Sequence, residues 1–276
     1  MKKTLFLLLI VALLLCACGQ KQEKQVNIAA STRPMAQFAS LLTEGTGLTV
    51  QPVVTEAVSC LHDYTLSVAQ MKTLEQAEVV ILSGGDTDAF LQHATKGNKW
   101  VVDASRAVSL WEDDPHYWLD PVCVKQMVTG LAQELSNIYP QHKDAFVKNL
   151  VALNEKLDDL VAKRDSILAG ISMQGLVTFH DGFRYFARFA GTEVLAALEE
   201  EHGSEVSAKD LENIILLVKN QQIPVIFVEE NGSDNAAKTV AKETGATILT
   251  LSMCMGTEDY FSAMEQNLET LKEAFS

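Results

Sequence analysis

Three of the six histidines follow predicted strands, at positions where a metal site could be built. They are His62 in the loop TEAVSCLHDY, His116 in DDPHYWLDP and His180 at the end of VTFH. Imidazole nitrogens commonly bind Zn²⁺ and related divalent metals. Each histidine has an aspartate nearby that could accept a hydrogen bond from its ring and orient it: Asp63, Asp114 and Asp181. These residue types indicate a three-histidine metal site. The alternative is that each histidine is a hydrogen-bonded structural residue.

The elements that would position these histidines are eight strand-like runs alternating with helical patterns. The runs are Val26–Ala30, Leu48–Val54, Glu78–Leu82, Trp100–Asp103, Leu176–Phe179, Glu193–Ala197, Pro224–Val228 and Thr247–Leu251. Nearly continuous apolar runs such as Val79–Leu82 are typical of strands buried on both faces of a parallel sheet. Alternating strands and helices predict an α/β fold. Ligands of such sheets bind beyond the carboxyl ends of the strands, so the three histidines would meet in a cleft between two halves.

A stretch without strands separates the two sets of runs. From His142 to Ala169, apolar residues recur at spacings of 3, 4 and 7: Phe146, Leu150, Leu153, Leu157, Leu160, Val161 and Leu168. This predicts one amphipathic helix, some 28 residues and roughly 40 Å long; the alternative is two shorter helices with a bend. The predicted fold has two lobes, residues 26–140 and 171–276. Each lobe holds a roughly four-stranded parallel sheet flanked by helices, and one long rigid helix, residues 141–170, bridges them.

The first residues are typical of an export signal. Lys2 and Lys3 precede an apolar run that is short for a membrane-spanning helix, which needs about 20 residues. The end of this segment, LCACG, looks like a bacterial lipobox, which implies cleavage before Cys18 and lipidation of that cysteine. We therefore expect a signal peptide at 1–17, a lipid-anchored tether at 18–25 and an extracytoplasmic location on the cell membrane. The alternative is an ordinary cleaved signal or an uncleaved anchor.

Composition narrows the function classes. With 47% hydrophobic residues in 276, the chain can bury a core and is not a disordered tail. A formal net charge of −14 disfavours nucleic acid and suits a protein that handles cations. The cysteines beyond the N-terminal segment are Cys60, Cys123 and Cys254, with no CxxC pair. We expect at most one disulfide.

The chain resembles the zinc/manganese-binding lipoproteins of bacterial ABC importers. The resemblance extends over about Val26 to Phe275, and its most specific segments are DPHYWLDP and HDGFRYFA. It implies two α/β lobes, a long helix between them and a metal held in the interlobe cleft. It also places His62, His116 and His180 at ligand positions. Many manganese-type members have glutamate at the position of His180, so the resemblance favours Zn²⁺ with Mn²⁺ as the alternative.

One position departs from this family. Its fourth ligand is usually an aspartate after the last strand, where this chain has Ser252. Candidates to complete the shell are Glu229, Glu230, Cys254, Ser252 itself or water. A thiolate at Cys254 would bind zinc strongly, whereas a buried thiol would only fill space.

The expected function is capture of Zn²⁺ and its delivery to an ABC permease and its ATPase, by a monomer that binds no nucleic acid. A zinc hydrolase is the first rival, because three histidines with an open water position form a catalytic layout, with Glu229 or Glu230 as base. Against an enzyme, the chain has neither HExxH nor GxSxG. The other rivals are a surface adhesin and a binding protein for an organic solute.

Overall fold

The structure is a computed structural model that describes residues 26–56, 61, 64–111, 114–199, 206–230 and 235–276. The predicted signal and tether, with Cys18, lie outside the described residues, and so do Cys60 and His62. Among the described residues, no helix is both long and apolar enough to cross a membrane.

Each half of the chain contains one parallel four-stranded sheet. The first has the order β2-β1-β3-β4, from β1 (Ile28–Ala30), β2 (Val50–Pro52), β3 (Val79–Leu82) and β4 (Trp100–Asp103). The second has the order β6-β5-β7-β8, from β5 (Leu176–His180), β6 (Val194–Glu199), β7 (Val225–Glu229) and β8 (Thr247–Leu251). The central strands β5 and β7 are buried along their whole length, as the nearly continuous apolar run Pro224–Val228 predicts for β7. The predicted two-sheet α/β fold is confirmed.

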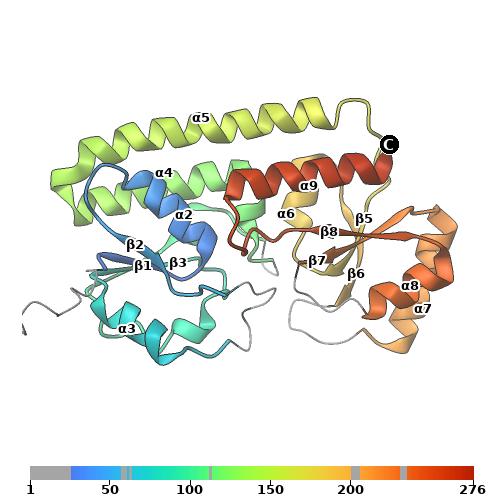
Figure 1. The fold of residues 1–276 in the computed structure, drawn as a ribbon, viewed down its shortest axis with the longest axis horizontal. Helices are drawn as coiled ribbons and strands as arrows, with labels where there is room; N and C mark the ends of the chain where they lie inside the picture. The colour runs from blue at the N-terminus through green and yellow to red at the C-terminus, as the bar shows by residue number, and fades with distance from the viewer. Residues whose placement is uncertain (1–25, 57–60, 62–63, 112–113, 200–205, 231–234) are drawn as a thin grey trace, which may run out of the picture.

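Helices and short 3₁₀ turns connect the strands (Figure 1). The first half contains α2 (Arg33–Leu42), α3 (Val68–Gln76), η1 (Ala89–Leu91), η2 (Ala104–Ala107), η3 (Tyr117–Leu119) and α4 (Pro121–Ile138). The second half contains α6 (Arg184–Ala190), α7 (Ala208–Gln221), α8 (Asn235–Thr244) and α9 (Tyr260–Phe275). Asp120 begins α4 by accepting the backbone N–H of Val122, and Pro121 occupies the first turn, where no N–H is needed.

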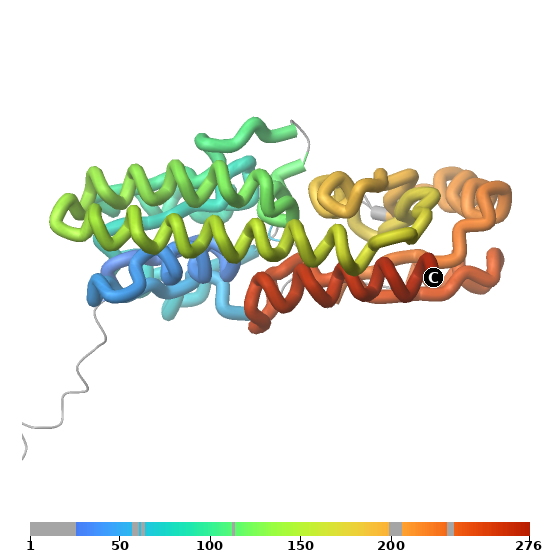
Figure 2. Tube along the Cα trace, turned by 90° about the horizontal axis from the view of Figure 1, so that it is seen from above, coloured from blue at the N-terminus to red at the C-terminus, as the bar shows by residue number. Residues whose placement is uncertain are grey.

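A single helix joins the halves. After the 3₁₀ turn η4 (Pro140–His142), α5 runs without interruption over Lys143–Ile167, which is 25 residues. It extends over both halves in Figure 1, and the view from above shows α4 along one part of it and α9 along another (Figure 2). Its buried side chains are Phe146, Leu153, Leu157 and Leu160, four of the predicted apolar positions. The single-helix prediction is therefore confirmed.

The apolar core is continuous between the halves. One cluster of buried side chains includes Phe38 of α2, Leu157 of α5, Phe227 of β7 and Leu268 of α9. Smaller clusters line the outer face of each sheet. The two lobes therefore share a packed interior along α5, and a change in their relative position would disturb many buried contacts.

Candidate metal site

His116 lies in the segment between β4 and α4, immediately before η3. Its side chain is buried, and its Nδ1 lies 2.9 Å from Oδ1 of Asp114, which also accepts the backbone N–H of His116 at 2.9 Å. An ionised carboxylate can only accept, so Nδ1–H is the donor and the lone pair is on Nε2. The contact confirms the predicted pairing of these two residues, in which Asp114 orients the imidazole of His116.

His180 is the last residue of β5 and is buried at the carboxyl end of the second sheet. Its Nδ1 lies 4.0 Å from Oε1 of Glu229, the last residue of the neighbouring strand β7. Parallel pairing of β5 with β7 places the ends of both strands at the same edge of the sheet. This register brings the carboxylate of Glu229 beside the imidazole of His180. Its negative charge favours a cation at this position.

The two histidines meet although they come from different lobes. The ring centroids of His116 and His180 lie 5.3 Å apart, with the planes at 89°. Trp118 packs edge-on against His116 at 5.3 Å and supports it from within the same segment. Two imidazoles at this separation, each beside a carboxylate, can direct nitrogens towards one divalent cation.

Gly182 lies between the two rings. A Cβ atom on this residue would be 2.7 Å from Cδ2 of His180, 3.0 Å from Cε1 of His116 and 2.8 Å from Cε of Met253. A side chain at this position would therefore have to displace the His180 ring or the end of Met253, and glycine allows the three groups to converge without such a shift. The sequence reasoning did not identify Gly182 or Met253 as part of the site, although both lie within two residues of predicted site positions.

Ser252 and Cys254, the candidate fourth ligands that follow β8, take part in a local hydrogen bond with each other. The hydroxyl of Ser252 accepts the backbone N–H of Cys254 at 3.1 Å and lies 3.4 Å from Oε2 of Glu230. Asn267 of α9 holds the backbone of Ser252 through both its N–H and its C=O. Cys254 has a φ of 60° and is buried, and burial, with smaller contributions from Glu230, raises the pKa of its thiol. Glu230 is exposed at the end of β7.

His62 lies outside the described residues, but the residues on either side of its segment are described. Tyr64 donates its hydroxyl hydrogen to Oε2 of Glu56 at 2.6 Å, and Gln70 donates to the same oxygen at 3.1 Å. The hydrogen bond from Tyr64 lowers the pKa of the Glu56 carboxyl. Glu56 and Tyr64 thus bring together the two ends of the segment that carries His62.

Within the described part of the chain, no group of three His, Cys, Asp or Glu side chains could hold a metal.

An ion pair joins the lobes beside this site. Arg188 of α6 donates from Nη2 and Nε to Oδ2 of Asp120, at 2.6 and 2.8 Å. Its guanidinium also lies over the ring of Trp111, 4.7 Å from the centroid, and Trp111 stacks on Tyr185 of α6. Asp120 belongs to the DPHYWLDP segment, so the residues flanking His116 are held directly against the second lobe.

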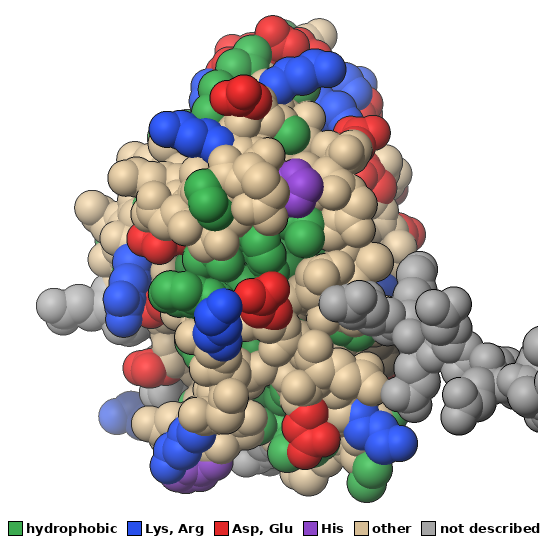
Figure 3. Space-filling model, turned by 90° about the vertical axis from the view of Figure 1, so that its left-hand side faces the viewer, with side chains coloured by type: hydrophobic (Ala, Val, Ile, Leu, Met, Phe, Trp, Pro, Cys, Tyr) green, Lys and Arg blue, Asp and Glu red, His purple; other side chains and the backbone are tan. Residues whose placement is uncertain are grey.

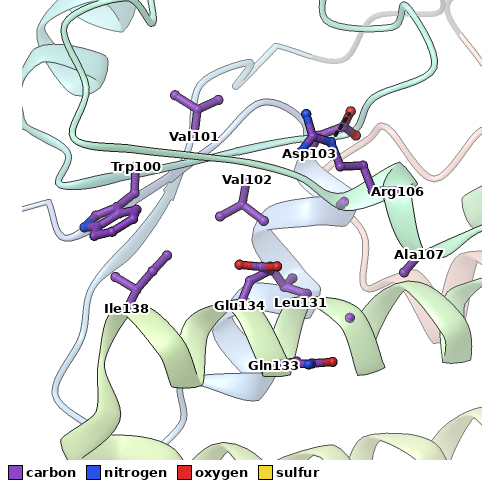
Figure 4. A pocket seen from close by; sticks show the side chains of 12 residues that line it. Trp100, Val101, Val102, Asp103, Arg106, Ala107, Leu131, Gln133, Glu134 and Ile138 are labelled. Atoms are coloured by element: carbon purple, nitrogen blue, oxygen red, sulfur yellow. Dashed lines mark ion pairs between the residues drawn. The ribbon is translucent and has the colours of Figure 1, made fainter.

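A separate cavity of about 320 Å³ lies away from these histidines, between β4 and α4. Figure 4 shows Trp100 and Ile138 at one end and Asp103 with Arg106 at the other, with Glu134 between them. None of its lining residues is a histidine or cysteine. On the end of the molecule seen in Figure 3, acidic and basic side chains are interspersed around a group of hydrophobic ones. Neither feature resembles a transition-metal site.

Comparisons with known proteins identify the family and the fold of the chain. The sequence profile of the family described as zinc-uptake complex component A, periplasmic, matches residues 28–274. The zinc-binding lipoprotein AdcA of Streptococcus pneumoniae is 31% identical over 219 residues, which cover 76% of this chain and 42% of AdcA. The chain thus spans less than half the length of that relative.

Two solved structures share the fold. A crystal structure of ZnuA has a TM-score of 0.83 and 25% identity, with 92% of this chain and 100% of that chain covered. The binding protein FpvC from Pseudomonas aeruginosa, in complex with Mn²⁺, has a TM-score of 0.80 and 25% identity, with 91% and 98% covered. The matches confirm the predicted family and fold. The matched family is described by zinc uptake, AdcA by zinc binding and FpvC by its complex with Mn²⁺, in agreement with the predicted metal-binding role.

Proposed function

Because the chain belongs to the zinc-uptake complex component A family, we propose that it captures Zn²⁺ between its lobes and delivers it to an ABC permease and its ATPase. The observation that carries the proposal is the meeting of His116 and His180, from different lobes, with centroids 5.3 Å apart. Oδ1 of Asp114 lies 2.9 Å from Nδ1 of His116, and Oε1 of Glu229 lies 4.0 Å from Nδ1 of His180, so each ring has negative charge near it. The family resemblance adds His62 as the third ligand.

Water is proposed as the fourth ligand. The Ser252 hydroxyl is bonded to the turn that follows it, and the buried Cys254 thiol has a raised pKa. Three neutral imidazoles leave the zinc charge to be balanced by nearby carboxylates: Asp114 is hydrogen-bonded to the His116 ring, and Glu229 lies 4.0 Å from the His180 ring. Glu230 is the competing candidate because its carboxylate lies 3.4 Å from the hydroxyl of Ser252.

Release would require separation of the lobes. His116 moves with the first lobe and His180 with the second, so a small relative shift would take one ligand out of reach. The continuous core along α5 limits such a shift, which is consistent with a need for the permease to drive release. The lipobox-like LCACG segment and the relative named a lipoprotein support anchoring outside the cytoplasmic membrane through Cys18. The chain is proposed to act there as a monomer.

Calorimetric titration of the detergent-solubilised full chain with Zn²⁺ and with Mn²⁺ tests the proposal. We expect one zinc per chain, weaker binding of Mn²⁺, and loss of zinc binding in His180→Ala and in His62→Ala. Glu230→Gln should leave the zinc affinity within about threefold if water completes the shell. Failure of the wild-type chain to bind zinc, or undiminished binding by His180→Ala, would contradict the proposal. Preferential binding of Mn²⁺ would favour manganese as the cargo, as in the Mn²⁺ complex of FpvC.

A further inference from the structure

The side chain of Met253 ends beside Gly182, at the wall of the proposed metal cleft. It is buried, and its terminal methyl lies 2.8 Å from the Cβ position of Gly182, the same point that His116 and His180 approach within 3.0 Å. The end of the methionine side chain and the two imidazoles therefore approach the same point beside Gly182. The sulfur is bonded to that methyl, and rotation of this unbranched side chain can turn it towards the rings.

The backbone of Met253 is attached to the segment that carries His116. Nε1–H of Trp118 donates to the carbonyl oxygen of Met253 at 3.0 Å, and the Trp118 ring packs against His116. The backbone carbonyl oxygen of Trp118 accepts a hydrogen bond from the hydroxyl of Tyr260 in α9 at 2.8 Å. These bonds hold Met253 in place although it comes from the second lobe.

The side chains at this wall of the cleft differ chemically from the aspartate that the family usually has at position 252. At position 252 the chain presents a serine whose hydroxyl is already bonded to Cys254 N–H, and the next residue presents a neutral, polarisable sulfur. Mn²⁺ prefers carboxylate and carbonyl oxygens, whereas thioether and imidazole ligands suit Cu(I). Zinc is intermediate and accepts imidazole readily.

We propose that Met253 is a specificity-determining residue of the cleft, whose thioether disfavours Mn²⁺ and allows Cu(I) to bind alongside Zn²⁺ as a second cargo. This rests on the proposed function, because it assumes that His116 and His180 bind the metal. It extends that function to a soft monovalent ion, held by two imidazoles and one thioether.

The test compares Met253→Leu, which keeps nearly the same volume without sulfur, with Met255→Leu, a buried methionine two residues along. Affinities for Zn²⁺, Mn²⁺ and Cu(I), the last supplied anaerobically with a competing chelator, are measured on the full chain. X-ray absorption at the copper edge then reports whether sulfur is bound to Cu(I). Cys254→Ser excludes the neighbouring thiol as the source of that sulfur.

We expect a copper–sulfur contact in the wild type, in Met255→Leu and in Cys254→Ser, and its loss in Met253→Leu. The Cu(I) affinity of Met253→Leu should fall at least about tenfold while its zinc affinity changes less than about threefold. Zinc binding that depends on His180, together with no Cu(I) binding or with no effect of Met253→Leu on Cu(I), would overturn this inference alone. Absence of zinc binding would instead overturn the proposed function.

Discussion

Oδ1 of Asp114 accepts two hydrogen bonds from His116, one from the backbone N–H and one from Nδ1, both at 2.9 Å. The side chain of Asp114 is fully buried, so the imidazole of His116 cannot exchange this partner for water without a rearrangement. One carboxylate oxygen thereby sets both the position and the tautomer of a proposed metal ligand.

Asp114→Asn should weaken zinc binding by about 10–100-fold, the range found when partners of metal-binding histidines are changed. An amide carries no charge and can present its NH₂ group to Nδ1, which would leave the wrong nitrogen for the metal. Calorimetric zinc titration measures the effect. Asp158→Asn serves as the control because Asp158 is an exposed residue of α5, where it pairs with Lys125 of α4. Equal affinities of Asp114→Asn and the wild type would contradict the assigned role.

Gly182→Ala should reduce zinc affinity at least about tenfold by pushing the two rings apart, because near-productive geometry is required within about half an ångström. The added Cβ would lie 2.7 Å from His180 and 3.0 Å from His116. Gly182 does not have a positive φ, so the backbone itself accepts alanine. Gly97→Ala, where a Cβ would meet nothing within 4 Å, should bind zinc as the wild type does. Titration of both variants separates steric displacement of the ligands from a general effect of alanine.

The sequence contained most of the information about the fold. Nearly continuous apolar runs predicted the buried strands β3 and β7, and spacings of 3, 4 and 7 predicted α5, because each pattern follows the geometry of a single element. The helix is shorter than the predicted 142–169 because it begins after a 3₁₀ turn at Pro140–His142 and ends at Ile167.

The site was less accessible from the sequence. The positions of His116 and His180 at strand ends were visible, but the convergence of Gly182 with Met253 joins residues that are far apart in the chain. Likewise, nothing local marks Arg188 as the partner of Asp120. Such contacts depend on how the lobes pack, which periodicity within one element does not determine.

Arg188→Met should destabilise the protein by about 1–3 kcal/mol and raise the zinc dissociation constant a few-fold, because it leaves the buried Asp120 carboxylate without its charged partner. The arginine side chain is 42% exposed, which keeps the effect below that of a fully buried pair. Urea unfolding and zinc titration measure the two quantities. A double-mutant cycle with Asp120→Asn isolates the pair, since Asp120 also begins α4. Arg106→Met, at an arginine 85% exposed, should change stability by less than about 0.5 kcal/mol. A similar effect of both arginine variants would argue against a specific role of the interlobe pair.

Asp88→Asn should change how stability depends on pH. The Asp88 carboxyl is buried, and Oδ2 accepts the backbone N–H of Gly84 at 2.6 Å. Burial raises its pKa to about 7 from the ordinary 3.8, and the nearby charge of Asp103 adds to the shift. Between these two pH values the native chain keeps a proton that the unfolded chain has lost. Stability is therefore greatest below about pH 4 as far as this group is concerned, and falls by up to about 1.4 kcal/mol per pH unit as the pH rises towards 7.

Asparagine stays neutral throughout this range, so the metal-free variant should lose a few kcal/mol less than the wild type between pH 5 and pH 8. Urea unfolding at four pH values in that interval gives both curves, and their difference removes the titration of groups common to both proteins. Asp86→Asn provides the control, since Asp86 is exposed in the same loop and asparagine also tolerates its φ of 66°. Parallel curves for Asp88→Asn and the wild type would show that the Asp88 carboxyl is ionised in the folded protein across this range, and that the buried site stabilises its charge.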